Sequence, residues 1–284
     1  MTTLTKPATA GTGTGARVRF GDLVAAEWIK LWSLRSTCWG LAVTALIVVG
    51  TNVNSAISDM NNWARYSPGI RDNFVPTWSI RDAFTDPAAL VLVLATASIG
   101  AIMIVGEYSS GLIRTTFAAV PARRSVLAAK FLVVTPVMLA YGAVVSGASF
   151  WVTQAILSRE DVGLSISYPG ALQAVTASAL LPAVCALVGM GLGALIRHTA
   201  TTIVTATLLL LMLPTMIEPN QPWKAALHHA LPLNAWQRLT DISPVNLGPP
   251  ILYPATITES WLVYAIWPLV AAVLTLIVVP RRDV

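Results

Sequence analysis

The sequence predicts an all-α polytopic membrane protein with six transmembrane helices. Hydrophobic residues make up 55% of the 284 residues and charged residues only 11%, whereas soluble domains carry about 25% charged residues. The apolar residues also fall into uninterrupted blocks of about 18 or more, the length that crosses a hydrocarbon core of about 30 Å. We therefore expect the chain to fold within a lipid bilayer.

Residues 1–16 are predicted to form a disordered tail. They are mostly Thr, Gly and Ala, and such a segment cannot bury enough apolar surface to become ordered. Residues 17–284 are then expected to form a single transmembrane domain.

An interfacial helix is predicted between Phe20 and Arg35, because apolar side chains, Trp28 among them, fall broadly on one side of a helix with Lys30 opposite. Glu27 and Arg35 interrupt the apolar stripe. Either these two side chains extend to the headgroups, or this face of the helix contacts another protein.

Six apolar blocks follow this helix and define the predicted spans. Asp86 and Pro87 predict the start of the second span, with Asp86 as the N-cap and Pro87 in the first helical position. Pro280 and the arginines after it predict the end of the last span. The spans lie at about 38–57, 87–106, 126–151, 172–196, 200–217 and 261–279.

The basic residues predict that both termini are cytoplasmic. With this orientation, 12 of the 18 Lys and Arg residues lie inside, as the preference for positive charge on the cytoplasmic side requires. The inside set is Lys6, Arg17, Arg19, Lys30, Arg35, Arg114, Arg123, Arg124, Lys130, Arg197, Arg281 and Arg282.

The spans lack the groups that several classes of membrane protein need. None contains Asp, Glu, His or Arg, and Lys130 near the end of the third is the only lysine. Proton-coupled carriers and intramembrane enzymes require ionisable groups at depth, so both classes are disfavoured, while sodium coupling through Ser, Thr and Asn stays open. Cys38 and Cys185 occupy different blocks, so neither a disulfide nor a metal site is expected. The basic residues form no run with interleaved aromatics, which argues against nucleic acid as a partner.

Two pairs of small residues predict close helix packing: Gly142 with Ser146, and Gly189 with Gly193. We expect these contacts within the chain rather than at a dimer face. After the fifth span, residues 223–240 are predicted to form one or two short helices broken by Pro232 at the outer surface. The adjacent histidines at 228 and 229 are expected on a solvated helix, since a metal site needs further ligands.

The segment between the second and third spans, GEYSSGLIRTTFAAVPARRSVLAAK at 106–130, resembles the first cytoplasmic loop of ABC-2 type permeases. In that family an acid closes the second span, then come a Ser/Gly turn, a short helix, a proline, basic residues and a lysine that opens the third span. Segments 26–39 and 230–239 resemble the family's interfacial helix and outer loop. The matching loop positions are Glu107, Gly111, Arg114, Thr115, Pro121, Arg123, Arg124 and Lys130.

The resemblance implies a permease subunit in a bacterial inner membrane. A short cytoplasmic coupling helix would dock on a separate ATPase subunit, which would hold the ATP and magnesium, while this chain binds no cofactor. Partners would be that ATPase, a second copy or a related permease, and membrane lipids. The absence of G-x-x-x-x-G-K-[ST] agrees with a chain that is not itself an enzyme. The expected cargo is a lipid, a peptide or a drug-like compound, moved outward.

Two alternatives stay open. The chain could be a membrane anchor, sensor or assembly subunit without transport activity, whose loop holds a cytoplasmic partner. An embedded enzyme would need a polar cluster, and Asp72, Asp82, Asp86 and His228 show no recognisable catalytic spacing.

Overall fold

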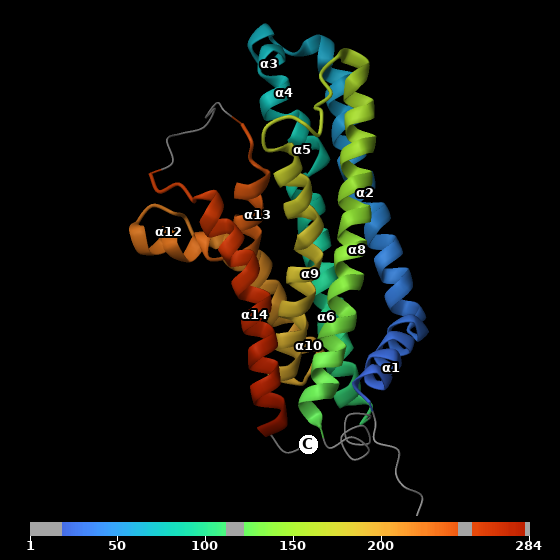
Figure 1. The fold of residues 1–284 in the computed structure, drawn as a ribbon. Helices are drawn as coiled ribbons and strands as arrows, with labels where there is room; N and C mark the ends of the chain where they lie inside the picture. The colour runs from blue at the N-terminus through green and yellow to red at the C-terminus, as the bar shows by residue number, and fades with distance from the viewer. Residues whose placement is uncertain (1–18, 112–121, 244–251, 282–284) are drawn as a thin grey trace, which may run out of the picture.

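The computed structural model describes residues 19–111, 122–243 and 252–281 (Figure 1). In these ranges the chain is helical and contains no strand. The predicted tail at 1–16 and the predicted coupling helix, with Arg114, Thr115 and Pro121, lie outside the described residues.

The helices follow one another with short connections. Beside the α-helices, the described chain has 3-10 turns at Trp63–Arg65 and Ser158–Glu160 and a π-helical turn at Leu208–Met212. The α-helices are α1 (Phe20–Ser33), α2 (Arg35–Asn62), α3 (Pro68–Asp72), α4 (Phe74–Thr77), α5 (Ser79–Ala83), α6 (Asp86–Ser109), α8 (Arg123–Leu157), α9 (Ala171–Ile196), α10 (Thr199–Thr207), α11 (Leu213–Met216), α12 (Pro222–His229), α13 (Pro232–Thr240) and α14 (Ile257–Arg281).

Within the described ranges, 6 helical stretches are long and apolar enough to cross a membrane, and each overlaps one predicted block. The outer helices α2 and α14 expose large apolar side chains, including Leu46 at 74% and Leu269 at 63%. Surfaces of this kind suit contact with lipid tails. The coarse prediction of a multi-pass helical membrane protein is confirmed. The stretches are Arg35–Arg65, Ser79–Ser109, Arg123–Glu160, Ala171–Ile196, Thr199–Met216 and Ile257–Val279.

The predicted start of the second span was wrong in detail. The N-cap of α6 is Thr85, whose side chain accepts a hydrogen bond from the backbone N–H of Ala88, so Asp86 is already the first helical residue. The last helix, α14, ends at Arg281, where Pro280 and the following arginines predicted its end.

Helix α9 is the centre of the bundle and packs chiefly against α6, α8 and α14 (Figure 1). Glycines permit the closest approaches. A β-carbon at Gly189 would overlap the carbonyl oxygen of Ala97 in α6, and one at Gly142 in α8 would overlap that of Ala179 in α9. Ser146 donates a hydrogen bond of 2.8 Å to the carbonyl of Val175. The small residues therefore pack within the chain, as predicted.

The two ends of the bundle differ. Helices α3 and α4 lie at the end opposite α1 (Figure 1), where Trp63, Tyr66 and Phe74 make edge and stacked ring contacts. Helix α12 projects to one side, and α13 packs against α9 and α14. Since α13 begins at Pro232, the predicted break there is confirmed.

Gly189→Ala should destabilise the protein by about 1–3 kcal/mol, because the added methyl group must push α6 and α9 apart. Gly50→Ala in α2 is the matched control: nothing lies within 4 Å of a β-carbon there, and alanine is the better helix former by about 1 kcal/mol. Thermal unfolding of both variants in detergent checks this. Equal midpoints for the two variants would contradict the packing.

Candidate functional site

Helix α1 folds back against the first turns of α8. Its Leu23, Val24 and Leu31 pack into a cluster that includes Val126 and Leu127 of α8. The predicted single apolar stripe is therefore divided between two faces of the helix, one packed in the bundle and one exposed.

The exposed face of α1 is aromatic. Phe20, Trp28 and Trp32 are 46%, 48% and 50% exposed, and the rings of Trp28 and Trp32 meet edge to face with centroids 5.7 Å apart. Aromatic rings with one polar edge are typical of a membrane–water interface.

Glu27 lies on the packed face, and neither of the two expectations for it is correct. Its side chain is 3% exposed, and its Oε2 lies 2.5 Å from the Nζ of Lys130 in α8. The acid that interrupts the apolar stripe thus pairs with a lysine of the same chain. Arg35, the other interruption, is exposed.

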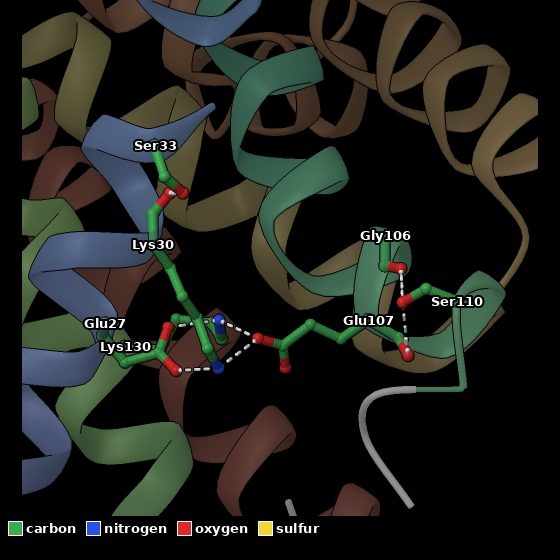
Figure 2. A network of polar contacts seen from close by, with 7 residues as sticks. All are labelled: Glu27, Lys30, Ser33, Gly106, Glu107, Ser110 and Lys130. Atoms are coloured by element: carbon green, nitrogen blue, oxygen red, sulfur yellow. Dashed lines mark hydrogen bonds and ion pairs between the residues drawn. The ribbon is translucent and has the colours of Figure 1, made fainter. Parts of the chain in front are cut away.

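Lys30 and Glu107 complete the group (Figure 2). One carboxylate oxygen of Glu107, Oε1, accepts from Lys130 at 2.9 Å and from Lys30 at 3.0 Å, and Lys30 also donates to Glu27 Oε1 at 2.8 Å. We call Glu27, Lys30, Glu107 and Lys130 the charge cluster. It joins α1 to the end of α6 and the start of α8.

The charge cluster contains two positive and two negative groups, and most of it is buried. Lys130 is 2% exposed and Glu107 13%, while Lys30 at 39% forms the outer edge. Partial burial acts to lower the pKa of Lys30, but its hydrogen bonds to Glu27 and Glu107 raise the pKa above its usual value. Lys30 consequently keeps its charge at neutral pH. Removing one member of such a buried group strands an opposite charge, which costs about 3–5 kcal/mol.

The chain turns sharply after Glu107. Helix α6 ends in two serines, Ser109 and Ser110, whose hydroxyls both donate to the carbonyl of Gly106. Gly111 follows with φ +72°, in the left-handed region that favours glycine after a helix. Gly111 therefore has a local role in ending α6.

The charge cluster thus lies on both sides of the segment 112–121. Glu107 is on the helix that enters this segment, and Lys130 is on α8, which begins just after it. At the start of α8, Arg123 is partly buried and Arg124 is exposed.

Among the predicted residues, the fold gathers Glu27, Lys30 and Glu107, whereas Trp28 and Gly111 lie apart from the charge cluster. Lys130 matched the loop pattern, but its role as the partner of Glu27 was not predicted. The sequence features that could have revealed this pair are a single acid in the apolar stripe of α1 and a single lysine in an apolar block.

No group of three or more His, Cys, Asp or Glu that could hold a metal occurs among the residues the structure describes. The rings of His228 and His229 lie 5.7 Å apart, edge to face, at the end of α12.

A scan against models of known protein families and a search of curated proteins found no match. The chain is therefore characterised by its own features: a multi-pass helical bundle with a buried, balanced charge cluster where three helices meet. The ion pairs of this cluster connect α1, α6 and α8 directly.

Lys130→Met should lower the stability by about 3–5 kcal/mol, since Glu27 and Glu107 would then share only the half-exposed Lys30. Glu27→Gln combined with Lys130→Met should lose less, because a balanced pair, Lys30 with Glu107, remains. Lys224→Met, at a lysine over the ring of Trp223, is the control. Thermal unfolding in detergent measures all three; a double variant no more stable than Lys130→Met would contradict the charge balance.

Proposed function

We propose that this chain is the permease subunit of an ABC-2 type exporter, driven by ATP that a separate cytoplasmic subunit hydrolyses. The observation that carries the proposal is the charge cluster, which connects α1 to the two helices on either side of the segment 112–121. The resemblance of residues 106–130 to the family's coupling loop supports the same assignment.

The route for a displacement follows from these contacts. A force on the segment 112–121 acts directly on the end of α6 and the start of α8. Because Lys130 binds both Glu27 and Glu107, either α1 moves with α6 and α8, or Lys130 and Glu27 each lose one of their two partners.

The close backbone packing supports the next step. Gly100 and Gly189 bring α6 and α9 together without intervening side chains, so a shift of the α6 end is passed to the central helix rather than absorbed by side-chain rearrangement.

The proposed orientation has both termini and the charge cluster on the cytoplasmic side, with α1 in the interface. The exposed aromatic face of α1 suits this depth. The cargo class is a lipid, a peptide or a drug-like compound, and the complex would contain two permease chains, identical or related, with two ATPase subunits in a bacterial inner membrane.

The orientation predicts which positions an impermeant thiol reagent reaches in intact cells. With Cys38 and Cys185 replaced by alanine, a cysteine at the exposed Asn61 should react and one at the exposed Ser109 should react only after lysis. Labelling at Ser109 in intact cells would show that the topology is the opposite of the proposed one, and would remove the basis for a cytoplasmic charge cluster.

The central test is affinity purification of the tagged protein from its native membrane, with mass spectrometry and an ATPase assay. We expect a stoichiometric ATPase to co-purify. Glu107→Gln should insert normally but lower the ATPase rate of the complex at least about fivefold, the factor that corresponds to a coupling of about 1 kcal/mol. Glu160→Gln, at an exposed acid beyond the other end of α8, should leave the rate unchanged.

Each failure has a different meaning. A clean preparation without an ATPase would favour an anchor, sensor or assembly subunit. A co-purifying ATPase that Glu107→Gln does not affect would keep the exporter but exclude the charge cluster from coupling.

A further inference from the structure

Arg197 occupies the turn between α9 and α10. It is the C-cap of α9 with φ 60°, a conformation that favours glycine. Its guanidinium lies over the ring of Tyr108, 4.8 Å from the centroid. Tyr108 follows Glu107 in α6, so Arg197 lies at the same end of the bundle as the charge cluster.

The charge of Arg197 is not compensated by any described carboxylate. All ion pairs among the described residues belong to the charge cluster, and the Nε and Nη2 of Arg197 are buried without a hydrogen-bond partner. A buried charged donor without an acceptor is strongly unfavourable. Contact with the tyrosine ring offsets only part of this cost. These two nitrogens are closed to solvent, but the residue as a whole is partly exposed, so an anion from outside can approach the remaining, exposed part of the side chain.

The sequence leaves few acids that could fill this role from the rest of the chain. Outside the described ranges, the printed sequence contains one acidic residue, Asp283. Apart from Asp283, we expect the counter-charge for Arg197 to come from a different molecule.

The position of Arg197 indicates which kind of molecule supplies the counter-charge. Only Arg197 and His198 separate α9 from α10, and both helices belong to candidate spans. A two-residue turn between spans lies at the depth of the headgroups, where basic pockets between helices bind lipid phosphates. His198 already accepts a hydrogen bond from the N–H of Thr201 as the cap of α10, which leaves the guanidinium as the group that binds the anion.

We propose that Arg197, held against Tyr108, binds the phosphate group of an anionic lipid headgroup. The planar guanidinium suits a phosphate, to which it can donate two hydrogen bonds. The site is separate from the charge cluster and does not depend on the proposed exporter function.

The test is native mass spectrometry of the purified protein with phosphatidylglycerol or phosphatidylcholine at equal concentration. Wild-type protein should retain the anionic lipid preferentially. Arg197→Gln should weaken retention of phosphatidylglycerol about fivefold, the effect of one basic residue near anionic headgroups, and Arg197→Lys should keep part of it. Only the fraction that elutes as a folded monodisperse species is compared.

Four results would overturn the proposal. Arg159→Gln, at an exposed arginine beyond the far end of α8, should leave retention unchanged; an equal loss would mean unspecific attraction. Inorganic phosphate that displaces the lipid at low millimolar concentration would make a soluble anion the ligand. A rise in lipid retention in Asp283→Asn would identify the chain's own C-terminal segment as the occupant, and unchanged retention in Arg197→Gln would exclude the site.

Discussion

The burial of one ammonium group, that of Lys130, determines how this end of the molecule is built. Lys130 is 2% exposed in a helix whose neighbouring residues are apolar, and an isolated charge there would be unstable. Two carboxylates from different elements supply the compensation. Because Glu27 comes from α1, this helix cannot lift from α8 without leaving Lys130 and Glu27 poorly paired. Separating α1 from α8 therefore has an electrostatic cost, which is a property that the proposed coupling would need.

The charge cluster could transmit little movement if the helices that it contacts were loosely packed. Helix α9 is apolar on all sides, as expected for a helix surrounded by protein, and its glycines place it against the backbones of its neighbours. The outer helices α2 and α14 instead expose apolar side chains to the surroundings. The molecule thus combines a stiff centre with an outer layer that suits lipid, and the charge cluster lies where the stiff centre reaches α1.

The sequence predicts the features that depend on local composition. The spans follow from the length of the apolar blocks, and the break between α12 and α13 from Pro232, because both signals are contained in one segment. The partner of Glu27 could not be predicted in this way, since Lys130 lies 103 positions away and only the tertiary fold brings α1 onto α8. The error at the start of α6 has a local cause: Thr85 and Asp86 are both good N-cap residues, and the side chain of Thr85 is the one that bonds Ala88. The division of the stripe in α1 likewise depends on where the helix docks, which hydrophobic periodicity does not reveal.

The buried Lys130 and the partly exposed Arg197 differ in how their charges are compensated, and this difference separates their proposed roles. Lys130 donates to two carboxylates of its own chain, so its charge is compensated without any other molecule. Arg197 has an aromatic ring beside it but no described carboxylate, and it occupies a backbone conformation for which glycine would be the less strained choice. A side chain kept at such a position without an internal counter-charge is suited to meet an external one. The same end of the bundle therefore holds the charge cluster around Lys130, with its proposed role in coupling, and, beside Tyr108 of α6, the proposed site for an anion from the surrounding membrane.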